Sequence, residues 1–500
     1  MKTRLGLIII VVFQAALVAS LTAIVASKRI PLGIPGEWEW LRPHSFPQVA
    51  WLAGAALALG AYAFFVALGF RVFSRARRSS WAREVFLVAQ LLLASVAIQV
   101  LIPMGAADEY DLTRWAYVNY LGSSTGYYKV AKQQALADPW KFLAEYPVWI
   151  QGQDSLHIGT HPPGLIALEC FLIGTMEQKP ALTDLLLRFM PWSTAQGFRQ
   201  LEKMDQRAIP RADRAALYAA SLITLLACAG TVVPLYLLGR SVLLAPAAWV
   251  AASLWPLAPA ANLFQPDADA AYPFLSTTAL ALAAWAARWA AGHRGNAPSV
   301  MLAMVCGIVL AFGTFFTLAF LPVGLIVVLV VVLAPTLSSA KKAGLIVAIG
   351  CGFLSLIALG WILTGANPLV VWTWNLRNHA RFYVEYPRTY RAWLVVNPIE
   401  LVVALGLPAV VWCACGLAGP RSVPRSAWAT LAVLVFLNLI GRNMGEVARL
   451  WMLFLPPILP AAGAGFCRMR GGPLSLGISA GLLGVQTLAL QTLIQVVYPV

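Results

Sequence analysis

The sequence predicts an all-α polytopic membrane protein, and three observations lead to this prediction. The chain of 500 residues is 60% hydrophobic and 11% charged, whereas soluble globular domains have about 25% charged residues. Apolar runs long enough to cross a bilayer recur from one end of the chain to the other. The net charge of +16 does not indicate nucleic-acid binding, because Lys and Arg concentrate in short loops between the apolar runs.

Runs of roughly 17–25 apolar residues predict about thirteen membrane-crossing helices. The first run follows Lys2 and Arg4, as in a signal peptide, but it is too long for a cleaved one, so we expect an uncleaved first helix. The predicted helices lie near residues 5–27, 49–72, 84–104, 162–177, 214–239, 271–291, 297–317, 320–336, 343–364, 394–417, 426–441, 448–467 and 473–498.

One apolar segment, 241–263, is left over. Pro246, Pro256 and Pro259 interrupt it, so a re-entrant or half-spanning hairpin is expected there. With that assignment the basic loops, including 178–213, fall on the cytoplasmic side together with the N-terminus. The protein is then expected in the cell inner or plasma membrane, with an extracytoplasmic side that collects the C-terminus and loops 28–48, 105–161, 264–270, 365–393 and 441–447.

All seven cysteines lie in or at the ends of apolar runs, without metal-ligand spacing. We interpret them as small core residues.

The long polar loop 105–161 opens with Asp108, Glu109 and Asp111, three carboxylates in four positions after an apolar run. A carboxylate at the edge of a membrane suits a general acid or base, and two together can bind a divalent cation. The alternative is a hydrated acidic start to a surface helix. The same loop is rich in Tyr and Trp, which favours amphipathic helices in the interface or a shelf for a sugar or lipid headgroup.

Two histidines end this loop. His157 and His161 have the i, i+4 spacing that places side chains on one helical face, and with a carboxylate they could hold a metal. Pro162 argues against helical geometry at His161. Substrate hydrogen bonding or a local structural role are the alternatives.

Further polar residues recur on the same predicted side. Asp267 and Asp269 precede an apolar run, and a charge there must face water, a partner or a substrate cavity; simple solvation of a turn is the alternative. Loop 365–393 carries four arginines, among them Arg377 and Arg381, together with His379. Loop 441–447 contains Glu446 and leads to Arg449. Arginine grips phosphate oxygens bidentately, and contact with anionic headgroups is the alternative.

These elements resemble the GT-C superfamily of polytopic glycosyltransferases, which includes the protein O-mannosyltransferases and the aminoarabinose transferases of lipid A. The resemblance rests on Asp108-Glu109 after a helix, on the loop that follows, and on His161-Pro162-Pro163-Gly164 opening the next helix. The stretch from Gly445 to Trp451 resembles a late motif of such enzymes, and Asp267 or Asp269 stands where many carry an acidic residue. Two departures are the additional transmembrane helices in 1–83, before a GT-C-like domain over 84–500, and Gly164, where a larger apolar residue is usual.

The resemblance implies transfer of a sugar from a polyprenyl-phosphate donor to a lipid, glycan or protein acceptor on the extracytoplasmic face, with inversion. Asp108 would accept the acceptor proton, with Glu109 in support. Arg377, Arg381 or Arg449 would meet the charge of the departing phosphate. Many members need no metal, so no cofactor is expected, although a divalent ion is possible. The substrate-binding residues expected from the loops are His157, His161, Asp267, Asp269, Arg377, His379, Arg381, Glu446 and Arg449.

Two other classes of function remain open. A transporter or flippase of a lipid-linked saccharide would also need arginines and a polar cavity, but transporters usually show internal repeats, which this sequence lacks in matched positions. A non-catalytic membrane scaffold that retains the fold is the other alternative.

Overall fold

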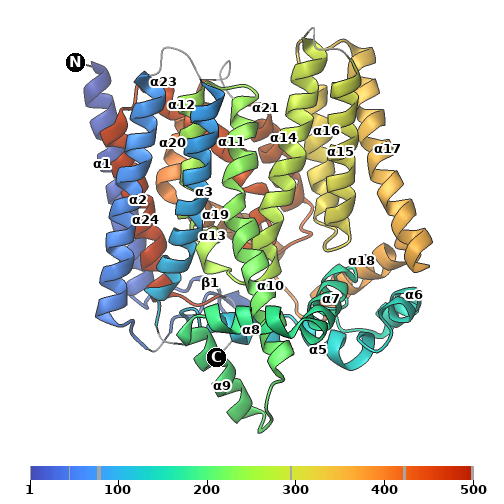
Figure 1. Ribbon diagram of the computed structural model, residues 1–500. Helices are drawn as coiled ribbons and strands as arrows, with labels where there is room; N and C mark the ends of the chain where they lie inside the picture. The colour runs from blue at the N-terminus through green and yellow to red at the C-terminus, as the bar shows by residue number, and fades with distance from the viewer. Residues whose placement is uncertain are drawn as a thin grey trace.

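The computed structural model describes residues 2–43, 45–75, 80–107, 109–292, 296–419 and 424–496. The chain is a bundle of roughly aligned helices with further helices gathered at one end, and one two-stranded hairpin (Figure 1). The predicted all-α polytopic class is therefore confirmed, and the chain is an integral membrane protein. We call the end where residues 105–210 gather, at the bottom of Figure 1, the loop end.

The helices that build the bundle are, in chain order, α1 (Lys2–Ala26), α2 (Val49–Arg75), α3 (Trp81–Met104), α10 (Arg211–Gly230), α11 (Val232–Arg240), α12 (Ala245–Leu254), α13 (Pro259–Leu263), α14 (Tyr272–Ala291), α15 (Asn296–Thr314), α16 (Phe320–Val332), α17 (Ser339–Thr364), α19 (Tyr390–Leu405), α20 (Leu407–Leu417), α21 (Arg425–Leu439), α23 (Leu459–Arg468) and α24 (Pro473–Leu493). The elements at the loop end are β1 (Gly33–Ile34), β2 (Trp38–Glu39), α4 (Arg114–Tyr120), α5 (Tyr127–Val130), η1 (Ala131–Ala135), α6 (Pro139–Trp149), η2 (Ile150–Gly152), α7 (Gly164–Gln178), α8 (Pro180–Phe189), α9 (Trp192–Met204), η4 (Ala268–Ala271), α18 (Pro368–Glu385) and α22 (Val447–Leu450).

Eight helices in the described residues are long and apolar enough to cross a membrane, or nine if α19 and α20, which meet at 103°, form one broken span. Phe320–Val332, Arg425–Leu439 and Met452–Arg468 are shorter apolar helices. The predicted number of about thirteen crossings is not confirmed.

The predicted crossing at 162–177 is wrong. Helix α7 has 15 residues and lies among the loop-end helices (Figure 1). The loop after it returns to the 105–135 region, where Thr194 Oγ1 donates to the Leu112 carbonyl at 2.8 Å and Tyr128 Oη donates to Asp213 at 2.6 Å. Loop 178–213 therefore lies on the same side as loop 105–161, and not with the other basic loops.

The predicted half-span at 241–263 is also wrong. Arg288, near the end of α14, donates to the carbonyl oxygens of Arg240 and Ser241 at 2.7 and 3.0 Å, while η4 leads directly into the start of α14. A helix of 20 residues is about 30 Å long, so the chain from 241 to 268 runs the length of the bundle. It does so as two helices, α12 and α13, joined by the short η3 (Trp255–Leu257). Every residue from 247 to 267 is buried, which explains why its prolines are tolerated.

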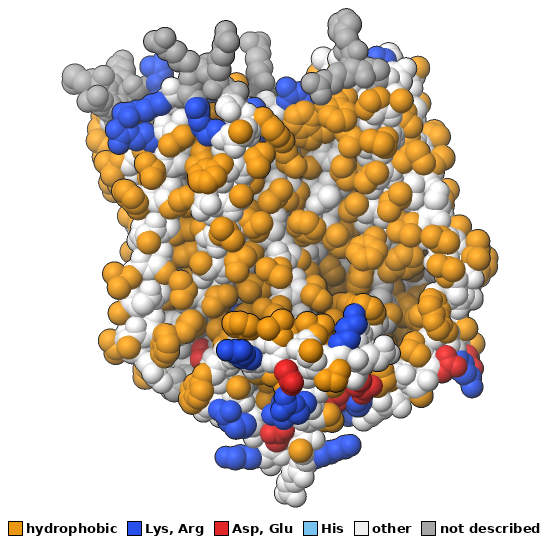
Figure 2. All heavy atoms as spheres, viewed as in Figure 1, with side chains coloured by type: hydrophobic (Ala, Val, Ile, Leu, Met, Phe, Trp, Pro, Cys, Tyr) orange, Lys and Arg blue, Asp and Glu red, His pale blue; other side chains and the backbone are white. Residues whose placement is uncertain are grey.

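Charge separates the two ends of the bundle (Figure 2). The end opposite the loops carries basic residues at the termini of α2, α14, α17, α21 and α23. In the described part of the chain the acidic residue at that end is Glu84, which pairs with Arg240 at 2.9 Å. Of the basic loops, residues 76–79, 293–295 and 420–423 lie outside the described residues. Helix α1 begins at this end, whereas Gln495 pairs with Leu41 at the loop end.

Small residues let the apolar helices approach closely. A Cβ atom at Gly307 of α15 would collide with the Ile349 carbonyl of α17, and one at Gly352 would collide with the Met304 carbonyl. Close packing of this kind is the usual basis of helix association in membranes. Cys170, Cys228, Cys306 and Cys413 are buried as predicted, but Cys351 and Cys467 are exposed on the bundle surface.

The presence of glycine, and not a larger residue, at position 164 has a steric explanation. The Gly164 N–H donates to the Phe315 carbonyl at 2.9 Å, and a Cβ atom there would collide with the same carbonyl group. The residue that departs from the family pattern thus allows the start of α7 to touch the connection between α15 and α16.

Candidate functional site

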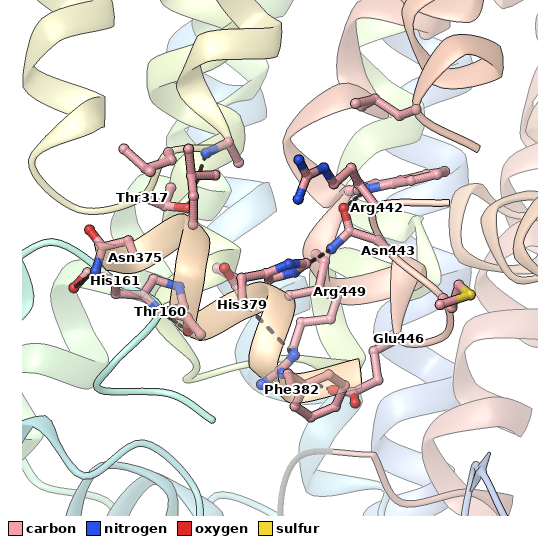
Figure 3. Close-up of a pocket in the computed structure, with 18 of the residues that line it drawn as sticks. Thr160, His161, Thr317, Asn375, His379, Phe382, Arg442, Asn443, Glu446 and Arg449 are labelled. Atoms are coloured by element: carbon pink, nitrogen blue, oxygen red, sulfur yellow. Dashed lines mark hydrogen bonds and ion pairs between the residues drawn. The ribbon is translucent and has the colours of Figure 1, made fainter. Parts of the chain in front are cut away.

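A cavity with a volume of about 390 Å³ lies at the loop end. Most of its lining comes from four segments that are distant in sequence: residues 155–161, the connection from α15 to α16 with the start of α16, helix α18, and residues 442–454. Asp269, Arg388 and Leu437 also line it. Figure 3 shows Thr160, His161 and Asn375 on one side, Arg442, Asn443 and Glu446 on the other, and His379 and Phe382 between them. Its polar lining residues include Ser155, His157, Thr160, His161, Asp269, Thr317, Asn375, His379, Tyr383, Arg388, Arg442, Asn443, Glu446 and Arg449.

Arg449 is the centre of a buried ion cluster in the wall of this cavity. Its Nη1 atom lies 3.0 Å from Asp267 Oδ2, its Nε atom 3.6 Å from Asp269 Oδ2, and its Nη2 atom 2.9 Å from Glu446 Oε2. The Arg449 side chain is 12% exposed. Guanidinium stays charged when buried and presents several donors in one plane, so one arginine can hold carboxylates from two distant segments.

A second arginine extends this cluster. Arg388 donates to the Met444 carbonyl at 2.7 Å and to Glu446 Oε1 at 3.2 Å. Its guanidinium also stacks on Phe382 and Trp393, at 5.4 and 5.5 Å from the ring centroids. Arg388 and Arg449 therefore grip the two oxygens of one carboxylate.

Arg442 differs from both. It lines the cavity, and the described residues provide no carboxylate partner for its guanidinium. Burial lowers the pKa of neighbouring His379 to about 4, and the charge of Arg442 contributes in the same direction. Asn443 Nδ2 is 3.4 Å from His379 Nε2, and Asn443 Oδ1 accepts from Trp451 Nε1 at 3.1 Å. The cavity thus offers one unmatched cation beside neutral polar groups.

The two predicted histidines share one turn. His161 Nδ1 lies 2.9 Å from the His157 carbonyl oxygen, which assigns a proton to Nδ1 and leaves Nε2 as an acceptor. Asn375 donates to the carbonyl oxygens of Gly159 and His161 at 3.1 and 3.0 Å, so α18 holds the turn in place. In the described residues no group of three His, Cys, Asp or Glu side chains is arranged to hold a metal.

A smaller void of about 20 Å³ adjoins the cavity behind His161 and Asp269, next to Tyr127 and Tyr272. This volume can hold one water molecule.

We expect the protein to lose stability as the pH falls from about 6.5 to about 4. Burial lowers the pKa of both His161 and His379 to about 4, whereas an unfolded histidine titrates near 6.5. The unfolded chain therefore binds more protons in this range, and the stabilisation is complete only above it. The apparent melting temperature of the purified protein, recorded against pH, measures the effect. The double variant H161N/H379N should show a flatter dependence, and an unchanged slope in that variant would contradict the assignment.

The structure brings six of the predicted residues to the cavity: His157, His161, Asp269, His379, Glu446 and Arg449. Asp267 lies behind Arg449 and also borders the smaller void. Asp108 lies outside the described residues. Glu109 is exposed, and its charge acts on Tyr110 and Tyr117.

Two predicted arginines do not line the cavity. Arg377 is exposed and stacks on Trp374 at 4.9 Å, and Arg381 pairs with Glu385 at 3.0 Å and donates to the Gln153 carbonyl. Successive residues on helix α18 face different directions. The residues of α18 that line the cavity are Asn375, Leu376, His379, Phe382 and Tyr383. Arg388 and Arg442 line the cavity, whereas Arg377 and Arg381 do not. Both belong to loops that the sequence analysis singled out, 365–393 and 441–447.

Comparison with known proteins gives distant likenesses. No protein-family model and no curated protein matches the chain. Two crystal structures of the Archaeoglobus fulgidus oligosaccharyltransferase are similar, one tethered to an acceptor peptide with the NVT sequon and one in complex with Zn and sulfate. The identities are 13% and 14% and the TM-scores 0.39 and 0.40, over 75% and 81% of this chain. This chain covers 49% and 53% of those chains, so it matches about half of their length. No activity follows from so distant a likeness.

Proposed function

We propose that this protein is a membrane glycosyltransferase that takes its sugar from a polyprenyl-phosphate donor. The observation that carries the proposal is the cavity at the loop end, which Arg442 lines together with polar and apolar residues. In the described residues Arg442 has no carboxylate partner. Apolar lining residues include Leu318, Leu321, Pro322, Leu437, Leu450 and Phe454. Such a cavity suits a ligand that joins a hydrocarbon chain to an anionic, hydroxyl-rich head.

The charges favour one phosphate in the donor. Asp267, Asp269 and Glu446 pair with Arg388 and Arg449, so among the described residues that line the cavity one guanidinium, that of Arg442, is left for a ligand, which matches one negative charge better than the two or more of a pyrophosphate. Arg442 alone is free to form a charge-assisted hydrogen bond with a ligand. A sugar–phosphate–polyprenyl diester carries a single negative charge, which one guanidinium can match.

The proposed reaction needs a base and a stabiliser of the leaving group. The acceptor hydroxyl oxygen forms a bond to the anomeric carbon, the bond from that carbon to the phosphate oxygen breaks, and the hydroxyl proton passes to a carboxylate. The departing polyprenyl phosphate gains the electron pair and a second negative charge, which Arg442 would stabilise. The family resemblance assigns the base to Asp108. Asp269 is the second candidate, since it lines the cavity at 15% exposure.

The proposed orientation puts the cavity outside the cytoplasm. The opposite end carries the basic helix termini, with Glu84 as the acidic residue that the structure describes there. Short loops rich in Lys and Arg favour the cytoplasmic side. The donor and the acceptor would then meet on the extracytoplasmic face.

Replacing Arg442 by Gln should weaken the affinity for undecaprenyl phosphate about 10- to 100-fold, because a hydrogen bond to a charged group contributes about 1.5–3 kcal/mol. The measurement is quenching of tryptophan fluorescence in nanodiscs, with undecaprenyl phosphate, undecaprenyl pyrophosphate and undecaprenol as ligands. Arg377→Gln is the matched control, since Arg377 is an arginine of the loop end that does not line the cavity. Equal binding of undecaprenol and undecaprenyl phosphate, or equal losses in the two variants, would overturn the proposal.

A further inference from the structure

The hairpin between α1 and α2 reaches the junction that supports the cavity. Strands β1 and β2 pair Gly33 with Glu39 and Ile34 with Trp38, and Glu37 stands in the turn between them. The Glu37 carboxylate accepts from the backbone N–H of Thr389 at 2.9 Å, from its hydroxyl at 2.5 Å, and from Trp393 Nε1 at 2.6 Å. Thr389 is the N-cap residue of α19, and its own side chain makes no capping bond.

Glu37 therefore caps α19 from a distant part of the chain. A carboxylate at a helix N-terminus satisfies free N–H groups and interacts favourably with the helix dipole. The hydrogen bonds from Thr389 and Trp393 outweigh the effect of burial and lower the pKa of Glu37, so the group stays ionised near neutral pH. The junction of α18 and α19 is thus fixed by the N-terminal helix pair.

The contact continues from Trp393 toward the cavity. The Trp393 indole is held at its N–H by Glu37 and lies against the Arg388 guanidinium at 5.5 Å. Arg388 in turn holds Glu446 Oε1 at 3.2 Å, and the other oxygen of Glu446 holds Arg449 at 2.9 Å. Each step is a direct contact between side chains that are at least partly buried.

Steric fit ties the loop 441–446 to the same residues. Gly445 has a φ of +88°, and a Cβ atom there would collide with Arg388 Nη1 and press on the Trp393 ring. Arg388 also holds the Met444 carbonyl. A shift of Trp393 or Arg388 would therefore move the segment that carries Arg442 and Glu446.

We propose that Glu37 is a positioning residue: it fixes Trp393 and the start of α19, and through Arg388 and Glu446 it sets the positions of Arg442 and Arg449. The two additional N-terminal helices would then serve the cavity although they do not line it. This role rests on the proposed function only as far as ligand binding is concerned. The mechanical coupling between Glu37 and loop 441–446 does not depend on the proposed function.

The test compares Glu37→Gln with Glu39→Gln in the full-length protein in nanodiscs. Glutamine keeps the shape but places an NH₂ group against one of the donors, whereas the described structure gives the Glu39 carboxylate no hydrogen-bond partner. Hydrogen exchange should become about tenfold faster in peptides over 386–393 and also over 441–450 in E37Q, with no change over 339–364. The affinity for undecaprenyl phosphate should fall about tenfold, while E39Q behaves as the wild type.

Faster exchange confined to 386–393, with unchanged affinity, would overturn the proposal and leave Glu37 as a helix cap only. A wild-type protein that does not bind undecaprenyl phosphate would contradict the proposed function, while the exchange over 441–450 still decides the coupling. Glu37→Ala, which removes all the hydrogen bonds, serves if the glutamine variant exchanges like the wild type. Unchanged exchange over 441–450 in both variants would also overturn the proposal.

Discussion

Replacing Asp108 by Asn is expected to slow sugar transfer by about 10²- to 10⁴-fold, the usual contribution of a general base. Asparagine keeps the size of the side chain and removes its ability to accept a proton, so donor binding should remain. The measurement is the rate of label transfer from a polyprenyl-phosphate sugar in reconstituted protein, with the affinity for undecaprenyl phosphate recorded in parallel.

Two matched variants make this test specific. Glu109→Gln changes the next carboxylate, which is exposed, and we expect a smaller loss there. Asp269→Asn changes the carboxylate that lines the cavity beside Arg449. If D269N loses more activity than D108N, Asp269 is the base and the assignment taken from the family resemblance is wrong.

Replacing Arg449 by Met should destabilise the protein by about 3–5 kcal/mol, the usual cost of removing one partner from a buried ion cluster. Methionine fills much of the volume but leaves Asp267, Asp269 and Glu446 close together without their shared cation. The free energy of unfolding in mixed detergent micelles measures the effect.

Neutralising the carboxylates should reverse part of this loss. The triple variant R449M/D267N/D269N removes the uncompensated charges and should be more stable than R449M alone. Arg377→Met is the control, since an exposed arginine that stacks on one ring contributes about 0.5–1 kcal/mol. A triple variant no more stable than R449M would show that the cluster is not held by charge.

The fold could be predicted as far as apolar length and charge determine it. Uninterrupted runs such as 84–104 and 343–364 became α3 and α17, because a helix is the way to satisfy backbone groups in hydrocarbon. Two segments were assigned wrongly for opposite reasons. The run 162–177 is apolar because α7 packs among the other loop-end helices, and 241–263 crosses the bundle in spite of its prolines because it is buried from residue 247 onward.

These two errors cancel, because one predicted crossing is absent and one crossing that was not predicted is present. The segments near 264–270, 365–393 and 441–447 were therefore still expected on the same side of the membrane. In the structure, six of the proposed binding residues line one cavity. The pairing within the cavity could not be predicted. Arg388, Arg442 and Arg449 look alike in sequence, and only the approach of Asp267, Asp269 and Glu446 decides which guanidinium stays unmatched. The contact from Glu37 to Thr389 joins residues more than 350 positions apart. No local sequence pattern could therefore predict it.

The most direct measurement supplies the reconstituted protein with radiolabelled undecaprenyl-phosphate-linked glucose, mannose or arabinose and with envelope material from cells that lack this chain. The account predicts that one of these donors transfers its label to the acceptor, that undecaprenyl phosphate is released in equal amount, and that D108N slows both by about 10²- to 10⁴-fold. Label that stays on the lipid with every donor but moves to the other leaflet would contradict a transferase and identify a transporter of lipid-linked saccharides.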